Sequence, residues 1–354
     1  MTPVQSVRYC ATPAGRVAWS AMGSGPPLLC DSGWVSHLRQ QLELFAFGPF
    51  VAALAERFTV IRYDKPGCGL SAGRGAPDGD PPDLSFEAQI AVALAVADSA
   101  GADRFRMFGA SQGGQLAAAI AARYPERVEE LVLYGTCARG RDLAPAALRE
   151  SLVALVRSHW GLGSTMLASI FIPGPAPEEV AAFTRAQRLS ASALVAGRSL
   201  EVYYGTDVAA LLPAVRARTL VLHREADQAT AFALGREVAA LIPGATLVPL
   251  PGTSHLFYHG PWTEVRDAML GFLRLPAGPR LTGRELEVAA LIAAGLTNHA
   301  IASRLAIAPR TAEAHTENIR RKLEVRSRAQ IAAWITAAGQ DRVGTRPAVA
   351  RRST

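Results

Sequence analysis

The chain has 354 residues, of which 49% are hydrophobic and 19% charged, which excludes a disordered or collagen-like protein and indicates about two globular domains. The net charge is +7, yet residues 1–275 carry 24 Arg or Lys against 24 Asp or Glu, whereas residues 276–354 carry 13 against 6. This asymmetry favours an acidic partner for the last part of the chain, nucleic acid ahead of an anionic membrane.

Two further classes of protein are disfavoured. The sequence contains no run of about 18 uncharged apolar residues, the length needed to span a membrane. Residues 1–20 lack the apolar stretch of a secretory signal, so we expect a cytoplasmic protein. The four cysteines are widely spaced and form no C-x-x-C pair. We therefore expect reduced thiols, no metal site and no cofactor.

Strand-like apolar runs alternate with helical patterns through the first three quarters of the chain. Strands are predicted over 27–30, 58–63, 104–108, 128–134, 219–223 and 245–250. Helices are predicted over 38–57, 86–100, 112–124, 229–241 and 263–273. Such alternation is typical of an α/β fold with a mostly parallel sheet covered on both faces.

The stretch between Tyr134 and Thr219 interrupts this alternation. It contains helical patterns over 145–160 and 178–196, separated by a Pro-rich break, and no clear strand. A helical insertion above a sheet acts as a cap, which we place at 137–212. Its aromatic residues either contact a small ligand or form the core of the cap; they are Trp160, Phe171 and Phe183.

A G-x-S-x-G motif lies at the junction of a predicted strand and helix. It reads Gly109-Ala110-Ser111-Gln112-Gly113, directly after the strand 104–108. A sharp turn with small flanking residues holds a serine hydroxyl above a sheet, where it can act as a nucleophile. Ser111 is the candidate nucleophile.

A nucleophilic serine needs a basic histidine and a carboxylate that orients it, in the chain order Ser, acid, His. Asp227 follows the strand 219–223 and is the candidate acid, with Glu225 as its rival in the same loop. His255 follows the last strand and is the candidate base, with His259 as its rival. These residues predict acyl transfer through a Ser111–His255–Asp227 triad.

Residues 1–275 resemble the α/β-hydrolase fold family. Besides the motif at Ser111, the stretch 62–71 resembles the Y-D-x-x-G-x-G-x-S turn of that family, in which Asp64 is structural. The resemblance implies an oxyanion hole made by the backbone N–H groups of Gln112 and Trp34, although Ser32 replaces the usual histidine of that loop. The apolar cap, rich in Ala and Leu, suits a small apolar ester, lactone or thioester as ligand or substrate.

The last part of the chain predicts a small all-α domain. Thr282 and Glu285 have the spacing of a capping box at the start of a helix that ends near Gly295. Further helices are predicted over 298–305, 310–324 and 327–338. The helices 298–305 and 310–324 are joined by a brief turn, and the second is the longer and more basic one. This pattern is typical of a helix-turn-helix.

Residues 281–338 resemble the LuxR-type helix-turn-helix domain. The matching residues are Leu281, Thr282, Arg284, Glu285, Val288, Gly295, Leu296, Ile301, Ala302, Leu305, Thr311, His315, Asn318, Ile319, Lys322, Leu323 and Arg328. The resemblance implies that the helix 310–322 enters the major groove of double-stranded DNA, and that the domain binds as a homodimer. The implied DNA-binding residues are Arg310, Thr311, Glu313, Ala314, His315, Glu317, Asn318, Arg320, Arg321 and Lys322.

Two acidic residues stand at positions that the resemblance places near bases. Glu313 and Glu317 replace the lysines of many relatives; a glutamate can accept a hydrogen bond from cytosine but repels phosphate. We therefore expect an altered sequence preference. Arg310, Arg320, Arg321, Lys322 and Arg326 supply the positive charge.

The predicted chain thus has an α/β-hydrolase-like domain over 1–275, a linker over 276–280, a helix-turn-helix domain over 281–340 and a tail over 341–354. The leading hypothesis is a transcription regulator whose hydrolase-like domain senses, and could hydrolyse, a small molecule. The alternatives are an active serine hydrolase with an appended DNA-binding module, and a catalytically dead pocket that only binds. The sequence does not decide whether Ser111 is active.

Overall fold

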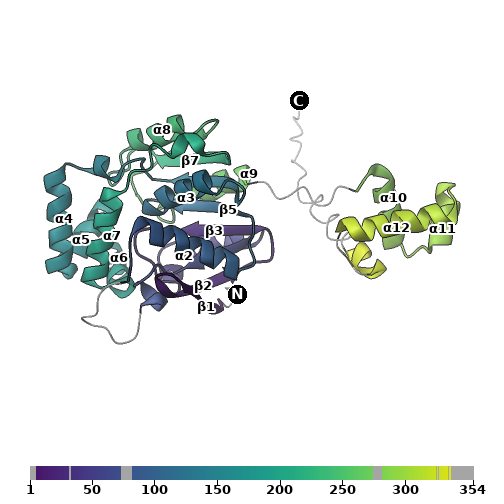
Figure 1. The fold of residues 1–354 in the computed structure, drawn as a ribbon, viewed down its shortest axis with the longest axis horizontal. Helices are drawn as coiled ribbons and strands as arrows, with labels where there is room; N and C mark the ends of the chain where they lie inside the picture. Colours follow the sequence, from purple (N-terminus) through teal and green to yellow (C-terminus); the bar gives the residue numbers. More distant parts are fainter. Residues whose placement is uncertain are drawn as a thin grey trace, which may run out of the picture. The chain divides into compact units, whose positions relative to one another are not determined.

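The computed structural model describes residues 5–31, 33–72, 82–273, 281–323, 325, 327–333 and 335. They form two compact units, divided between residues 273 and 281 (Figure 1). Ser32, Arg326, the predicted linker 276–280 and the predicted tail 341–354 lie outside the described residues. None of the described helices combines the length and the apolar character that crossing a membrane requires.

The first unit contains an eight-stranded sheet in the order β1-β2-β4-β3-β5-β6-β7-β8. Strands β3 to β8 pair in parallel, which confirms the predicted α/β class. Their bounds are β3 Pro27–Asp31, β4 Thr59–Tyr63, β5 Phe105–Ala110, β6 Val128–Tyr134, β7 Arg218–Arg224 and β8 Thr246–Leu250. The carboxyl ends of parallel strands meet at one edge of a sheet, where ligands bind in such folds.

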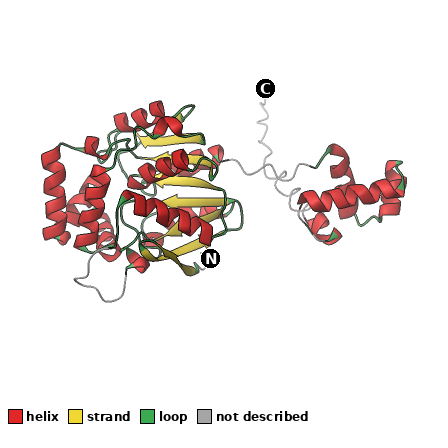
Figure 2. Ribbon diagram, in the orientation of Figure 1, coloured by secondary structure: helices red, strands yellow, loops and turns green. Residues whose placement is uncertain are grey.

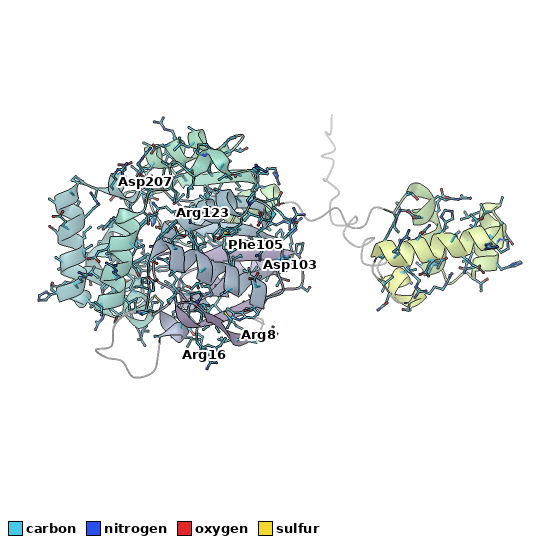
Figure 3. All side chains as sticks on the ribbon, viewed as in Figure 1. Arg8, Arg16, Asp103, Phe105, Arg123 and Asp207 are labelled. Atoms are coloured by element: carbon cyan, nitrogen blue, oxygen red, sulfur yellow. The ribbon has the colours of Figure 1, made fainter. Side chains whose placement is uncertain are left out.

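A hairpin at the N-terminal edge of the sheet was not predicted. β1 (Val7–Thr12) and β2 (Gly15–Met22) pair antiparallel, and β2 continues antiparallel onto β4. Arginines cover the rings of this edge: Arg8 lies over Trp19 and Arg16 over Tyr9. Figure 3 labels both arginines. Charged side chains on an edge strand oppose pairing with another chain.

Helices cover both faces of the sheet, as Figure 2 shows. α1 (Phe47–Ala55) and α9 (Trp262–Phe272) pack in the core cluster of one face. α2 (Phe86–Ser99), α3 (Gln112–Arg123) and α8 (Phe232–Leu241) contribute to the cluster of the other face. Apolar burial on both faces explains why the central strands are almost continuously hydrophobic.

The predicted helix over 38–57 is wrong in its first half. A 3-10 helix at Gln40–Glu43 is followed by Phe45, whose φ of 50° is left-handed, and only then by α1. A left-handed residue stops a right-handed helix, and the apolar periodicity of this stretch does not reveal it. The predicted helix over 229–241 begins later, at Phe232, because residues 229 and 230 belong to the loop around Asp227.

The cap between β6 and β7 contains four helices where two were predicted. They are α4 (Ala146–Ser158), α5 (Trp160–Phe171), α6 (Pro177–Ser190) and α7 (Ala193–Gly205). His159 separates α4 from α5, and Ser192 caps the N-terminus of α7 through the N–H of Val195. The predicted Pro-rich break separates α5 from α6.

The second unit contains α10 (Gly283–Ala293), α11 (Asn298–Leu305) and α12 (Pro309–Leu323), with residues 328–333 also helical. The predicted capping box is present: Thr282 accepts from the N–H of Glu285, whose side chain accepts from the N–H of Thr282. The small core is formed by Leu281, Val288, Ala289, Ile292, Ile301, Ala302, Ala312, Ile319 and Ile331. The turn between α11 and α12 passes through Ala306 in the left-handed region.

Candidate active site and DNA-binding surface

Ser111 occupies a strained turn between β5 and α3. Its φ of 55° and ψ of −124° are unusual for a residue with a side chain, and such strain is stored at functional sites. The turn needs its glycines. A Cβ on Gly109 would lie 2.4 Å from the carbonyl oxygen of Gly113, and a Cβ on Gly113 would lie 2.2 Å from that of Asp31.

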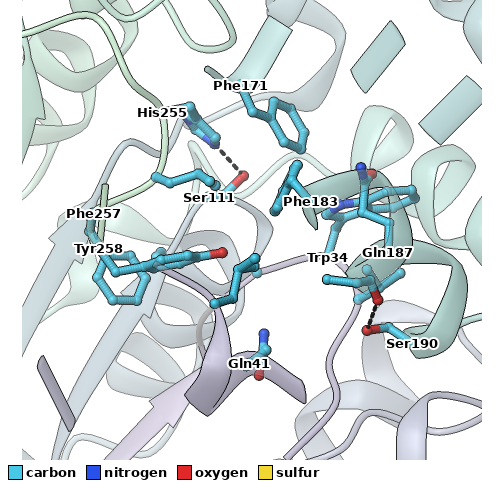
Figure 4. Close-up of a pocket in the computed structure, with 16 residues that line it drawn as sticks. Trp34, Gln41, Ser111, Phe171, Phe183, Gln187, Ser190, His255, Phe257 and Tyr258 are labelled. Carbon is cyan, nitrogen blue, oxygen red and sulfur yellow. Dashed lines mark hydrogen bonds between the residues drawn. The ribbon is translucent and has the colours of Figure 1, made fainter. Parts of the chain in front are cut away.

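The three residues of the predicted triad lie in hydrogen-bond contact. His255 Nε2 is 2.9 Å from Ser111 Oγ, and His255 Nδ1 is 2.8 Å from Asp227 Oδ2 (Figure 4 shows the first of these contacts). Each residue follows a different strand: β5, β7 and β8. The parallel sheet therefore brings together side chains that are far apart in the sequence.

Asp227 is held in one orientation by its own loop. Its Oδ1 accepts hydrogen bonds from the N–H groups of Ala229 and Thr230, which leaves Oδ2 for His255. Burial acts to raise the pKa of this carboxyl, but the charge of His255 and its hydrogen bond outweigh it, so that the pKa lies below its usual value. The carboxylate is thus ionised and able to stabilise an imidazolium.

The rival residues occupy other positions. Glu225 is exposed and its N–H donates to the carbonyl oxygen of Leu250. His259 Nε2 lies 2.9 Å from Glu179 Oε1, at the N-terminal end of the cap helix α6. The geometry therefore favours Asp227 and His255 over both rivals.

The candidate oxyanion hole is built from two backbone N–H groups. Gln112 is the first residue of α3, and the first N–H groups of a helix have no partner within it. Trp34 lies in the loop after β3 and lines the cavities beside Ser111. Its ring packs edge-on against Trp160 of the cap, with centroids 5.9 Å apart.

Two cap residues contact the triad: Phe171, whose role the sequence left open between ligand contact and cap core, and Tyr203, which the sequence did not single out. The hydroxyl of Tyr203, on α7, lies 3.4 Å from Ser111 Oγ. The carbonyl oxygen of Phe171, at the end of α5, accepts from the N–H of His255, and the two rings are 5.2 Å apart. No local motif marks these residues, because packing of the cap on the sheet brings them to Ser111.

Two cavities meet at the triad. One cavity, of about 50 Å³, is lined mainly by α6 and by the loops that follow β3 and β8. The other, of about 230 Å³, is lined mainly by apolar side chains of α4, α5 and α7. Both cavities are lined by Trp34, Ser111, Phe171 and His255. A carbonyl held at Ser111 would therefore have one substituent on each side.

The second unit presents the predicted DNA-binding residues on the outer face of α12. Ala312, Thr316 and Ile319 form the buried face of this helix. The exposed residues are Arg310, Thr311, Glu313, Ala314, Glu317 and Arg321, and the half-buried ones are His315, Asn318, Arg320 and Lys322. This arrangement leaves a continuous polar face for a partner.

Several of these side chains have partners within the unit. Lys322 forms an ion pair of 2.6 Å with the buried Glu285 of α10, so it also joins two helices. Arg321 donates to Asn318, and Arg320 pairs with the exposed Glu317. Arg321 is exposed and its asparagine partner is uncharged, which makes it a strong candidate for phosphate contact among the described residues.

Models of two protein families match the two units. The model described as alpha/beta hydrolase fold matches residues 26–260, more than half of the chain. The model described as bacterial regulatory proteins, luxR family, matches residues 279–335. Both predicted resemblances are confirmed.

Individual relatives match the first unit. A polyketide synthase, ThaQ of Burkholderia thailandensis, is 30% identical over 64% of this chain, which spans only 11% of the synthase. A pimeloyl-[acyl-carrier protein] methyl ester esterase of Nitrosomonas europaea is 26% identical, over 66% of this chain and 90% of the esterase. The enol-lactonase of Burkholderia xenovorans has a similar fold, with a TM-score of 0.64 and 23% identity over 75% of this chain and 99% of the lactonase.

Proposed function

The chain belongs to the α/β hydrolase fold family and carries a LuxR-type DNA-binding domain, and from this premise we propose that it is a transcription regulator that senses a small molecule. Its hydrolase unit binds and hydrolyses a small ester, lactone or thioester. The observation that carries the proposal is the hydrogen-bonded series Ser111–His255–Asp227, open to two cavities, in one chain with a helix-turn-helix. The name of the Nitrosomonas relative, an esterase, supports an ester carbonyl as the reacting group.

The reaction follows from the contacts at Ser111. His255 Nε2 accepts the hydroxyl proton as Ser111 Oγ attacks the carbonyl carbon, and Asp227 stabilises the imidazolium that forms. The oxyanion accepts hydrogen bonds from the N–H groups of Gln112 and Trp34. His255 then gives the proton to the departing alcohol or thiol, which leaves an acyl-enzyme on Ser111. Water, activated by His255, attacks this acyl group, and the acid is released as Ser111 regains its proton. We therefore propose that the pocket hydrolyses its ligand rather than only binding it.

The DNA-binding unit acts through α12 in the major groove. Its excess of basic residues, 13 against 6 over 276–354, matches the charge of a phosphate backbone. We expect the chain to bind in the cytoplasm as a homodimer, with half-sites about one helical turn apart. Side chains on the polar face of α12 contact bases and phosphates, with Glu313 and Glu317 disfavouring purely non-specific binding.

Ligand-dependent DNA affinity tests the sensor. A DNA site is first selected from a random pool with the full chain. The Ser111→Ala chain lacks the nucleophile and therefore leaves an added ester intact. This chain is titrated with the selected DNA in the presence and in the absence of p-nitrophenyl butanoate. We expect the affinity to change by roughly 5-fold or more, the lower end of typical coupling between sites. Equal affinities would contradict a sensor.

A second candidate is an active serine hydrolase whose helix-turn-helix only tethers it to DNA. The assembled triad favours hydrolysis in both proposals, so the two differ in coupling alone. Ester turnover that depends on Ser111, together with ligand-independent DNA affinity, would select the tethered hydrolase.

A further inference from the structure

One hydroxyl group of the smaller cavity has no hydrogen-bond partner among the described residues. It belongs to Tyr258, a residue that is 4% exposed and lies three residues beyond His255 in the loop after β8. Figure 4 shows this hydroxyl turned into the cavity that Ser111 also lines. Buried polar groups are almost always paired, so an unpaired hydroxyl that faces a cavity points to a ligand.

Packing holds the Tyr258 hydroxyl in one position. The ring of Tyr258 lies edge-on to those of Phe47 and Phe257, with centroids 4.9 and 4.8 Å apart. Its carbonyl oxygen accepts from the N–H of Ala46 at 3.1 Å. Both the backbone and the ring are therefore fixed, and the hydroxyl can meet a ligand without reorganisation of the loop.

The chemistry of this hydroxyl favours an acceptor on the ligand. Burial raises the pKa of the Tyr258 phenol, so the group stays protonated. A phenol is a better donor than acceptor, because the lone pairs of its oxygen are delocalised into the ring. Among the described residues that line the cavity, none is Asp, Glu, Lys or Arg. An uncharged acceptor oxygen is therefore the ligand group that suits this site.

Two other polar side chains of the smaller cavity are already engaged. Ser190 Oγ donates to the carbonyl oxygen of Ala186 at 2.7 Å, and Gln187 Nε2 donates to that of Ser164 at 2.9 Å. The Oε1 atom of Gln187 is closed off from the cavity. Both side chains thus direct donors toward the backbone of the cap.

Gln41 offers a second donor to the cavity. Its Oε1 accepts from the guanidinium of Arg62 at 3.3 Å, and its Nε2 has no partner in the described parts of the chain. A guanidinium can only donate, so this contact fixes which end of the amide faces Arg62. Tyr258 is the more buried of the two donors, and a hydrogen bond is stronger where less water competes for it.

We propose that the Tyr258 hydroxyl selects a ligand whose smaller half carries an uncharged acceptor oxygen, such as an ether, keto or hydroxyl oxygen, a few bonds from the reacting carbonyl. This inference rests on the proposed function, which places that carbonyl at Ser111. The smaller cavity, about 50 Å³, takes the short half that bears the oxygen, and the larger cavity, about 230 Å³, takes the apolar half.

Two pairs of p-nitrophenyl esters test the proposal. Methoxyacetate is paired with butanoate, and 3-methoxypropanoate with pentanoate, so that an ether oxygen replaces one CH₂ group and adds no donor. The ether oxygen also activates the carbonyl, so the ratio of kcat/KM within a pair is compared between variants. We expect this ratio to be roughly 10-fold larger in the unaltered chain than in Tyr258→Phe for at least one pair, because only the ether pairs the buried hydroxyl.

Two further variants serve as controls. Tyr124 is a half-buried tyrosine at the end of α3 that belongs to the described lining of neither cavity, so Tyr124→Phe should keep the ratio of the unaltered chain. Gln41→Leu removes the second donor. Ratios that Tyr258→Phe leaves unchanged in both pairs would overturn the proposal, and so would ratios that only Gln41→Leu lowers.

Binding separates this inference from hydrolysis. Ligand-observed NMR measures the affinity of the Ser111→Ala chain for both pairs of esters, with and without Tyr258→Phe. A preference for an ether that requires the Tyr258 hydroxyl supports the inference even if no ester is turned over. Affinities that Tyr258→Phe does not change, or an absence of binding, overturn it. Turnover that depends on Ser111, with the same ratios in both variants, would leave the proposed function standing alone.

Discussion

The hydrolase unit and the helix-turn-helix unit place their functional side chains in opposite surroundings. In the first, the Asp227 side chain is fully buried and His255 is 5% exposed, within a segment of balanced charge. In the second, Arg310, Thr311 and Arg321 are exposed on a helix of a basic segment. One unit encloses its candidate catalytic residues, whereas the other displays charged residues on its surface.

The difference also determines what holds each set of residues in place. The triad is positioned by buried hydrogen bonds from three strand ends and from the cap, such as that between His255 and Phe171. The outer face of α12 is positioned by the packing of its buried face, through Ala312, Thr316 and Ile319, and by the ion pair of Lys322 with Glu285. Single substitutions should therefore affect chemistry in the first unit and folding or affinity in the second.

The largest expected effect is on ester hydrolysis. Ser111→Ala should lower kcat for p-nitrophenyl butanoate by about 10⁴-fold or more, because it removes the nucleophile. DNA binding should persist. Steady-state kinetics of the full chain measure this, with the exposed Ser169→Ala as control. Hydrolysis that survives in Ser111→Ala would place the chemistry elsewhere.

A core substitution in the second unit tests the independence of the two units. Ile319 is fully buried in the small core, so Ile319→Ala should destabilise this unit by about 2–5 kcal/mol. DNA affinity should be lost while ester turnover is kept. Calorimetry and kinetics of the full chain follow both, with the more exposed Leu286→Ala as control. Loss of turnover as well would show that the units are not independent.

The pH dependence of stability tests the environment of Asp227. Its pKa is lower in the folded chain than in the unfolded chain, so the stability that it contributes is fully present above the unfolded value, about 3.9, and is lost as the pH falls through the folded value. The destabilisation caused by Asp227→Asn should therefore shrink below about pH 4. Denaturant unfolding at several pH values measures this, with the exposed Asp103→Asn as control. A destabilisation that is constant with pH would contradict the ionised carboxylate.

A smaller effect is expected from a single exposed arginine of α12. Arg321→Ala should reduce the slope of log affinity against log salt by about 1, since one phosphate contact is lost. Fluorescence anisotropy at several salt concentrations measures the slope. Arg188→Ala, an exposed arginine of the cap, should leave it unchanged. An unchanged slope in Arg321→Ala would remove this residue from the phosphate contacts.

The smallest effect concerns which sequences are bound rather than how tightly. Glu313→Lys should change the preferred bases, because an acceptor for cytosine becomes a donor. Selection from a random DNA pool compares the two preferences. Glu287→Lys, on α10, adds the same charge and should raise affinity without changing the preference. An unchanged preference in Glu313→Lys would show that this position contacts no base.

Local patterns predicted much of the fold. The parallel strands, the turn at Ser111 and the capping box at Thr282 each depend on residues close in the sequence. The β1–β2 hairpin was missed because its two strands have no clean alternation of buried and exposed residues. The division of the cap into four helices depends on single breaks such as His159, which a helical periodicity does not show.

The residues of the candidate site also differ in whether the sequence could predict them. Ser111, Asp227 and His255 could be predicted because each follows a strand in a fixed order. Tyr203 could not, because it lies on a cap helix whose position over the sheet is set by tertiary packing. The ion pair of Lys322 with Glu285 is likewise set by how α10 and α12 pack.

Labelling with a fluorophosphonate serine probe tests most directly whether the enclosed triad is active. The full chain and its Ser111→Ala variant are treated with the probe, and the labelled peptide is identified by mass spectrometry. We predict that Ser111 alone is labelled, and that the variant is not labelled at all. A folded chain that resists the probe, or is labelled at another residue, would contradict the proposal that Ser111 is an activated nucleophile.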